Sequence, residues 1–393
     1  MLKVDFDTRR VHSLTGRITP EVMRGAFRAV RRNRGSAGID RQSITMFEAN
    51  LADNLDALMR EMKDGSYQPI PLRRVYVPKG GGKFRPLGIP AVRCRVAQEV
   101  VRRLLNPIFD PCFHEQSHGF RENRSCHTAM ARIVDLRKQG YRVVVDADIK
   151  GFFDNIPHAL IMDLVAAKIA DGNVLGLVRK FLQAGVMEDG RVLPTRKGTP
   201  QGGVISPLLA NIVLNHLDWR LEALGYRFVR YADDFVVLCK TRRQAEKALV
   251  AVTQCIEEEL GLQLSPEKTH IATFGSGFNF LGYYISAFTI RMGEKAERRF
   301  KDKIRALTRR SLNLDQGVIE KVNRVIRGTV NYFGKPSFST CLGQFNELDR
   351  WFRRRIRSMK YKRIWMTDNR KLKNRYIQRM GVLTCREAYL SAR

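Results

Sequence analysis

The stretch RVVVDADIKGFFDNI, residues 142–156, decides how the rest of the chain is interpreted. Its first half, from Arg142 to Ile149, is β-branched and apolar, which is typical of a central strand in a sheet. Aspartate normally avoids strands, yet Asp146 and Asp148 stand inside this one. Because alternate residues of a strand share a face, both carboxylates are expected on the same face. The segment therefore predicts a buried strand that carries acids at its end.

A second acidic segment, YADD at residues 231–234, also lies beside strand-like sequence. Phe228–Val229 and Phe235–Leu238 flank a short turn at Ala232–Asp234, as expected of two strands joined by a turn. Helical patterns at Ala159–Ile169 and Leu208–Leu221 lie between the two acidic segments and would cover a sheet. This alternation predicts an α+β catalytic unit.

Each acidic segment by itself has a purely structural explanation, because aspartate is common at strand ends and in hairpin turns. Together the two segments indicate carboxylates that converge on divalent metal, since Mg²⁺ prefers hard oxygen ligands. Two such ions, roughly 3.5–4 Å apart, can hold the attacking and leaving oxygens of a phosphoryl transfer. A single acid could not hold both ions.

Charge is the strongest signal in the composition. The 393 residues include 70 Lys and Arg against 39 Asp and Glu, which gives a net charge of +31 and a pI near 10.4. Such a chain needs a polyanionic partner, and nucleic acid is the leading candidate. An anionic membrane surface is the weaker alternative, because no basic amphipathic stretch accompanies a lipid anchor.

Several classes of protein are excluded. With 44% hydrophobic residues the chain is not disordered, and no apolar run approaches the roughly 20 residues of a membrane span. The seven cysteines are dispersed without a CxxC pair and HExxH is absent, which fits neither a disulfide framework nor a zinc site. The start, MLKVDFDTRRVHSL, carries acids and lacks the apolar stretch of a secretory signal, so the cytoplasm is the expected compartment.

The two acidic segments belong to a longer series of motifs. In chain order these motifs are RGSAGIDRQSI (34–44), VPKGGGKFRPLGIP (77–90), HGFRENRSCHTA (118–129), DADIKGFFDNI (146–156), KGTPQGGVISPLLANIVLNHLD (197–218), YADD (231–234), LGLQLSPEKT (260–269) and FLGY (280–283). The series resembles the reverse transcriptases encoded by group II introns, over about residues 30–290. The first motif resembles the family's N-terminal extension and the second its first fingers motif.

The resemblance implies roles for the acids. Asp148 and Asp233 would bridge two Mg²⁺ ions, with Mn²⁺ as a substitute, Asp234 would complete the carboxylate set, and the Ile149 carbonyl would be a further ligand. Asp146 would support the metal site from behind, and Asp154 would end the segment. Lys268, in SPEKT, matches a lysine that protonates the leaving pyrophosphate, although an ordinary surface lysine on a turn is a nearly equal alternative.

The resemblance also implies a nucleotide site. Lys79 and Arg85 flank glycines 80–82, which let backbone approach a triphosphate closely, whereas a flexible hairpin tip is the plain alternative. A Walker A loop is excluded by its spacing. Phe153 matches a steric gate against the ribose 2′-OH, with Phe152 as its competitor for the core, because strand neighbours would face opposite ways. Gln201 would touch the nucleotide.

Beyond residue 290 the pattern changes to basic helices. Residues 291–393 hold 28 Lys and Arg against 9 Asp and Glu. Two apolar stripes predict helices, and each has a basic opposite face that indicates contact with nucleic acid rather than mere solvation. The stripes are Ala296, Phe300, Ile304 and Leu307, then Phe345, Leu348, Phe352, Ile356 and Met359; the basic faces are Arg298, Arg299, Lys303, Arg309 and Arg310, then Arg350, Arg353, Arg354 and Arg357.

Further resemblances complete the reading of the chain. Phe280, Leu281, Gly282 and Tyr283 resemble a primer grip. IRGTVNYF (326–333) and LDRWFRRRIR (348–357) resemble the family's thumb, or maturase, domain, which binds template, primer and the parent intron RNA. Phe352 is expected in the core, while Trp365 could stack on a base or pack. No cysteine pairs or HNH-like histidines follow, so endonuclease activity is not expected.

The predicted fold class is α+β: a right-hand polymerase with reverse transcriptase fingers and palm over residues 1–290, including an N-terminal extension to about 75. An all-helical thumb/maturase domain would follow at 291–365. A short basic tail would come next, at 366–393, as a possible remnant of a DNA-binding segment. The expected function is RNA-directed DNA synthesis with an RNA template, a DNA or RNA primer and dNTPs, together with assistance to splicing of group II intron RNA. A free-standing enzyme of repair or phage defence and a non-catalytic RNA-binding chaperone are the alternatives.

Overall fold

The computed structural model describes residues 10–80, 82–200 and 202–391 and divides the chain into two compact units. Unit 1 comprises Met1–Ser125, Val145–Val237 and Arg243–His270. Unit 2 comprises Cys126–Val144, Leu238–Arg242 and Ile271–Arg393. The boundaries near residues 290 and 365 were placed by composition and motif rather than by contacts, and they stay predictions.

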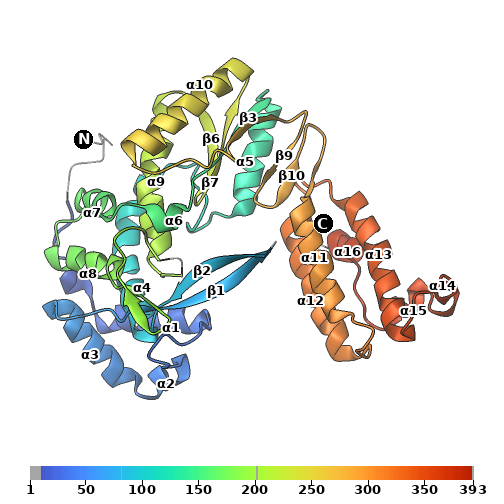
Figure 1. Ribbon diagram of the computed structural model, residues 1–393, viewed down its shortest axis with the longest axis horizontal. Coiled ribbons are helices and arrows are strands. Elements are labelled where there is room, and N and C mark those ends of the chain that lie inside the picture. Colours follow the sequence, from blue (N-terminus) through green and yellow to red (C-terminus); the bar gives the residue numbers. More distant parts are fainter. Residues whose placement is uncertain (1–9, 81, 201, 392–393) are drawn as a thin grey trace. The chain divides into compact units, whose positions relative to one another are not determined.

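Unit 1 contains both helices and strands (Figure 1). Its helices and helical turns are η1 (Thr15–Arg17), α1 (Pro20–Arg32), α2 (Ile44–Ala49), α3 (Leu51–Asp64), α4 (Val92–Phe109), η2 (Asp110–Cys112), α6 (Phe152–Asn155), α7 (His158–Ala166), α8 (Gly172–Leu182), α9 (Ser206–Ala223), α10 (Arg242–Thr253) and the π-helical η3 (Gln254–Glu259). The helices α7 and α9 confirm the two predicted between the acidic segments.

The first sheet has the strand order β2-β1-β4-β5. Its strands are β1 (Leu72–Gly80), β2 (Lys83–Ile89), β4 (Val186–Glu188) and β5 (Arg191–Leu193). The antiparallel pair β1-β2 places Val77 opposite Arg85, and the register shifts between Pro78 and Gly80. The predicted glycine-rich fingers loop is therefore the tip of a long hairpin.

The second sheet has the strand order β6-β7-β3-β8. Its strands are β3 (Val143–Asp148), β6 (Arg227–Tyr231), β7 (Asp234–Cys239) and β8 (His270–Thr273). Strand β3 confirms the strand predicted at 142–149, and its three valines are buried. Helix α9 packs against β6, and its side chains are buried around most of its circumference. The helix thus forms the centre of the core that supports this sheet.

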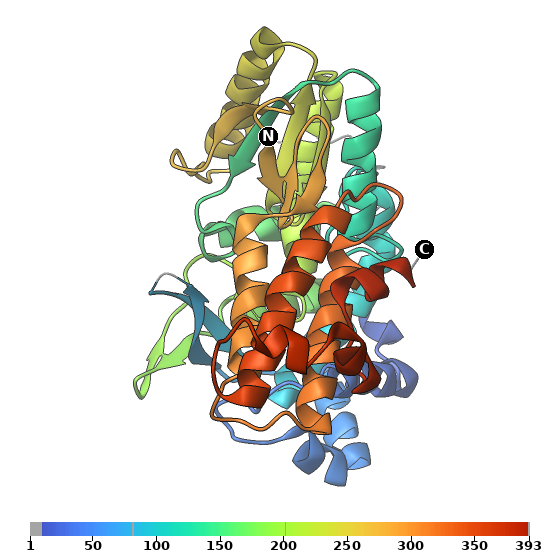
Figure 2. The ribbon, with the colours of Figure 1, turned by 90° about the vertical axis from the view of Figure 1, so that its right-hand side faces the viewer.

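Unit 2 is mainly helical (Figures 1 and 2). Its elements are α5 (Cys126–Lys138), the strands β9 (Phe278–Phe280), β10 (Tyr283–Ile285) and β11 (Ile290–Met292), then α11 (Glu294–Leu307), α12 (Gln316–Phe333), α13 (Leu342–Tyr361), α14 (Asp368–Lys371), α15 (Asn374–Arg379) and α16 (Cys385–Leu390). The three short strands form an antiparallel sheet in the order β11-β10-β9.

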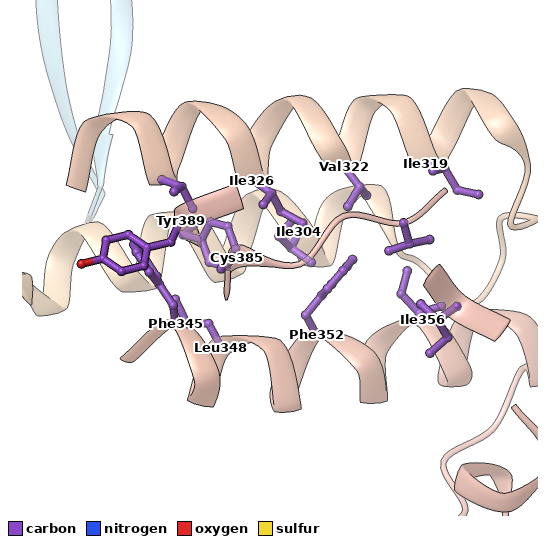
Figure 3. Packing of buried hydrophobic residues seen from close by; sticks show 14 of the residues in the cluster. Ile304, Ile319, Val322, Ile326, Phe345, Leu348, Phe352, Ile356, Cys385 and Tyr389 are labelled. Atoms are coloured by element: carbon purple, nitrogen blue, oxygen red, sulfur yellow. The ribbon is translucent and has the colours of Figure 1, made fainter. Parts of the chain in front are cut away.

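The apolar stripes predicted from the sequence build the core of unit 2. Phe345, Leu348, Phe352 and Ile356 on α13 point toward the apolar face of α12, as Figure 3 shows. Ile304 on α11 belongs to the same cluster. Phe352 is fully buried, which confirms its assignment to the core, whereas Trp365 is 63% exposed.

The segment expected to be a short basic tail carries three helices and contributes to the same core. Leu372, Ile377, Cys385 and Tyr389 are buried in this cluster. Helix α16 begins with a capping box between Thr384 and Glu387. These apolar residues are too sparse to form a visible stripe, which is why composition alone made the segment resemble a tail.

None of the described helices is long and apolar enough to cross a membrane. All seven cysteines are free thiols, as their dispersed positions predict.

Candidate active site

The two acidic segments meet at one pocket of unit 1. Asp148 is the last residue of β3, and Asp233 lies in the two-residue turn between β6 and β7. Because β7 lies beside β3 in the sheet, the turn reaches the end of β3. Asp148 and Asp233 line the same cavity of about 520 Å³. The convergence of these two carboxylates, inferred from separate motifs, is thus present in the structure.

The pocket gathers most of the nucleotide-site residues predicted from the sequence. Those that line it are Arg85, Asp148, Ile149, Phe153, Asp233 and Lys268. The side chain of Ile149 is a hydrocarbon, so only its backbone carbonyl could serve as a ligand. Asp154, expected merely to end its segment, also lines the cavity, and burial raises the pKa of its carboxyl group. These six predicted residues therefore line a single pocket.

Lys268 contacts Asp148 directly. The Lys268 Nζ atom donates a hydrogen bond to Asp148 Oδ2 over 2.7 Å. The segment that carries Lys268 is itself tied to β3, because the Ser265 amide donates to the Asp148 carbonyl at 2.7 Å and the Lys150 amide donates to the Gln263 carbonyl at 2.8 Å. These backbone hydrogen bonds hold the segment of Lys268 beside β3 and so keep the lysine at the pocket.

The electrostatics of the pocket disfavour two bare carboxylates. Burial raises the pKa of Asp233, and the negative charge of Asp148 raises it further, while Arg85 and Lys268 act in the opposite direction. Behind them, burial raises the pKa of Asp146 to about 6. Carboxylates crowded in this way are stabilised in their ionised form by a cation placed between them.

The donor set fits divalent metal. Asp148 and Asp233 offer hard carboxylate oxygens on one cavity, and the Ile149 carbonyl is adjacent in the chain. The charge of Asp148 raises the pKa of Asp233, and a cation bound between the two acids would relieve this repulsion. Asp234 begins β7 and is exposed, but it does not line the described pocket.

A buried ion pair that was not predicted holds the YADD turn. Arg230 and Asp218 both have fully buried side chains, and the Arg230 guanidinium donates to both oxygens of Asp218. It also donates to Asn211 Oδ1 at 2.9 Å and to the Ala232 carbonyl at 3.0 Å. Ala232 has a positive φ of 57°, so the turn needs outside support. The feature of the sequence that could have revealed this ion pair is Arg230, a charged residue within strand β6.

Gly119 and Asn211 complete the support of this turn. A Cβ atom on Gly119 would lie 2.3 Å from the Ala232 amide nitrogen, so only glycine allows this close approach. Asn211 Nδ2 donates to the Gly119 carbonyl at 2.9 Å. Both residues fall inside recognised motifs, yet their supporting roles follow only from the packing.

The two phenylalanines that follow β3 lie on a helical turn. Phe152 and Phe153 begin α6, so the strand alternation expected for them is wrong: β3 ends at Asp148, and Gly151, with φ of 55°, is the N-cap of the helix. Phe152 is nevertheless buried and Phe153 half-buried, with their rings 5.4 Å apart. The role of Phe153 as a sugar gate stays a prediction.

Two exposed aromatic side chains at the pocket were not predicted. Phe84 and Phe120 line it and are 60% and 58% exposed. Large apolar rings are unfavourable in water unless a partner covers them, and the face of a nucleobase is a suitable partner. The sequence could have pointed to both rings, because each lies next to a basic residue, Lys83 or Arg121, within one of the motifs.

Several predicted residues are not brought to the pocket. Gln201 lies outside the described residues, and so does the side chain of Lys79, whose backbone belongs to β1. The predicted primer grip lies in unit 2, on β9, β10 and the turn between them. Phe280 and Tyr283 have buried side chains, whereas Gly282 in the turn between the strands is exposed.

Comparison with known families shows the family to which the chain belongs. The family model described as reverse transcriptase (RNA-dependent DNA polymerase) matches residues 77–285, a range that contains the whole acidic pocket. The chain belongs to the reverse transcriptase family. It is therefore an RNA-directed DNA polymerase of the kind that the motif series predicted. A second family model, the group II intron maturase-specific domain, matches residues 297–377 of this reverse transcriptase.

The chain is also similar to individual proteins, among them a group II intron-encoded protein and a retron reverse transcriptase. Protein YkfC of Escherichia coli (strain K12) is 35% identical over 327 residues, which cover 72% of this chain and 86% of the relative. The group II intron-encoded protein LtrA of Lactococcus lactis subsp. cremoris is 30% identical, and the match covers 84% of this chain and 71% of the relative. The retron Mx162 reverse transcriptase of Myxococcus xanthus is 29% identical, and the match covers 54% of this chain and 46% of the relative.

Among solved structures, a telomerase from Candida albicans in complex with a fragment of telomeric RNA matches with a TM-score of 0.46 and 12% identity, covering 82% of this chain and 67% of that one. A partial Cas6-RT-Cas1–Cas2 complex matches with a TM-score of 0.39 and 22% identity, covering 63% of this chain and 42% of that one. Similarity at this level carries no argument about function.

Proposed function

We propose that this reverse transcriptase extends a primer on an RNA template by two-metal phosphoryl transfer. The observation that carries the proposal is the convergence of Asp148 and Asp233 on one pocket that also contains Arg85 and Lys268. In this reaction the primer 3′-OH attacks the α-phosphate of a dNTP and pyrophosphate leaves. This reaction needs carboxylates that bind the metal ions and basic side chains that bind the phosphates.

Asp148 and Asp233 would hold two Mg²⁺ ions, or Mn²⁺ in their place, with Asp234 and the Ile149 carbonyl as further ligands. When bound, such ions supply charge neutralisation at the attacking and leaving oxygens. The buried Arg230–Asp218 pair contributes by fixing the turn on which Asp233 lies. Preorganisation of this kind lowers the cost of assembling charged groups during the reaction.

The cationic side chains act on the phosphates. Arg85, on β2, would bind the triphosphate with its planar guanidinium, together with Lys79 and Gln201. Lys268 would move from Asp148 to the leaving pyrophosphate and donate a proton to it. Its 2.7 Å contact with Asp148 keeps the ammonium group at the pocket until the nucleotide arrives. Phe153 would close the space beside the sugar and favour dNTPs.

A primer-extension assay with an RNA template, Mg²⁺ and dNTPs tests this function. Asp233→Ala should lower the extension rate by roughly 10³-fold, because several kcal/mol of transition-state stabilisation would be lost. Asp163→Ala, an exposed acid on α7, is the matched control and should extend like wild type. Equal extension by wild type and Asp233→Ala would remove the proposal.

A second function, assistance to group II intron splicing, is favoured by the maturase-domain match and by a basic groove in unit 2. The groove, of about 650 Å³, is lined by Arg350, Arg353, Arg354, Arg357, Asn369, Lys373 and Asn374. It contains no acid, so it suits an RNA backbone. Splicing of a precursor RNA that contains the intron flanking this reading frame should be faster with the protein than without it; an unchanged rate would leave polymerase activity as the sole function.

A further inference from the structure

A second basic groove of unit 1 lies beside the catalytic pocket. It has a volume of about 600 Å³ and is lined by Lys150, Asn155, Pro157, His158, Ala159, Arg196, Lys197, Gly261, Leu262 and Gln263. The residues between Lys150 and Asn155 line the catalytic pocket instead. The helical turn α6 therefore separates the two cavities, and the groove begins two residues after Asp148.

The groove is positively charged without compensation. Lys150, Arg196 and Lys197 are exposed, and no acidic residue of the described part of the chain lines the cavity. Among the described residues, none of these three side chains forms an ion pair or a hydrogen bond. The catalytic pocket differs, because its cations Lys268 and Arg85 share the cavity with acids. Three uncompensated cations around one cavity favour an anion of high charge density.

Backbone dipoles act in the same direction. Pro157, His158 and Ala159, which line the groove, form the N-terminus of α7. This helix has no side-chain cap and no acid in its first turn. The first amide groups of a helix lack intrahelical partners and carry a partial positive charge. They add donors to a cavity whose cations already attract phosphate.

We propose that this groove binds the polyphosphate of free nucleotides or pyrophosphate, next to the pocket in which they react. The inference rests on the proposed polymerase function, since that reaction consumes a triphosphate and releases pyrophosphate. Three cations in a cavity of this volume match the charge of one polyphosphate. The groove would raise the local concentration of nucleotide before entry and receive the leaving group afterwards.

Pyrophosphate binding measured by calorimetry in EDTA tests the proposal. Without divalent ions, Asp148 and Asp233 repel a polyanion from the catalytic pocket, whereas the acid-free groove keeps its affinity. The variant Arg196→Gln/Lys197→Gln should bind pyrophosphate roughly tenfold more weakly than wild type. The matched control, Arg243→Gln/Lys247→Gln, removes two exposed cations from α10 and should bind like wild type.

Two results would overturn the proposal. One is equal pyrophosphate affinity of the groove variant and wild type, including no binding by either. The other is that the Arg196→Gln/Lys197→Gln variant loses as much affinity for an RNA hairpin as it loses for pyrophosphate. That result would assign the groove to a nucleic-acid backbone. Because the binding assay needs neither primer nor metal, primer extension by the same wild-type preparation reports separately on the polymerase function. Circular dichroism of each variant checks that it is folded.

Discussion

Arg230 in unit 1 and Arg357 in unit 2 are both buried, but only Arg230 faces a carboxylate. Arg230 donates to both oxygens of Asp218 and to the turn that carries Asp233. Arg357 donates to the Leu372 carbonyl at 2.9 Å and to Asn374 Oδ1 at 2.7 Å, and its neighbour in the groove is another cation, Arg353. Burial, together with that neighbour, lowers the pKa of Arg357.

The two environments serve different purposes. In unit 1 the internal ion pair neutralises its own charge and thereby fixes the geometry of the acids at the pocket. In unit 2 the positive charge on α13 is left for an external polyanion, because no acid lines the groove. A catalytic site needs fixed positions, whereas a nucleic-acid surface needs net charge. The predictions below test this contrast in order of decreasing effect.

The largest effect is expected for Arg230→Met. Loss of the guanidinium would leave Asp218 buried and unpaired, which should lower the free energy of unfolding by about 3–5 kcal/mol. Urea denaturation followed by circular dichroism measures this change, and primer extension should fall with it because the YADD turn loses its support.

Arg357→Met is the matched control for that prediction. It removes two hydrogen bonds but leaves no carboxylate unpaired, so a loss of about 1–2 kcal/mol is expected. Equal destabilisation by the two substitutions would contradict the view that only Arg230 belongs to an internal ion pair.

A smaller effect is expected when charge is removed from the basic groove of unit 2. Arg350→Gln/Arg354→Gln should weaken binding to an RNA hairpin roughly tenfold and reduce the slope of log affinity against log salt by about 1.5. Fluorescence anisotropy over a salt series gives both quantities. Arg243→Gln/Lys247→Gln is again the control, and an unchanged slope in the α13 variant would show that these arginines only solvate the helix.

The smallest effect concerns the sugar gate. Phe153→Ala should raise incorporation of ribonucleotides relative to dNTPs by roughly tenfold, because space for the 2′-OH opens beside the half-buried ring. Single-nucleotide extension with each sugar measures the ratio. Phe288→Ala, at a 92% exposed position of unit 2, should leave the ratio unchanged. If the Phe153 variant discriminated like wild type, the gate assignment would be lost.

Much of the fold and site could be predicted where the chain encodes them locally. The valines of β3 and the apolar stripes of α11 and α13 follow simple periods, and the structure contains those elements. Asp148 and Asp233 were predictable because each belongs to an acidic motif beside apolar, strand-like sequence. By contrast, the α6 turn after Gly151 and the folded segment after residue 366 gave no periodic signal.

The sequence by itself indicated the class of chemistry, since a net charge of +31 favours a polyanionic partner and two acidic motifs beside strand-like sequence favour a divalent cation. Only the tertiary structure decided which charges remain available to ligands. Arg230 and Arg357 are identical as residues, and their partners come from distant segments of the chain. Lys268 likewise reaches Asp148 across 120 residues. Such pairings depend on packing in space, which local sequence patterns do not specify.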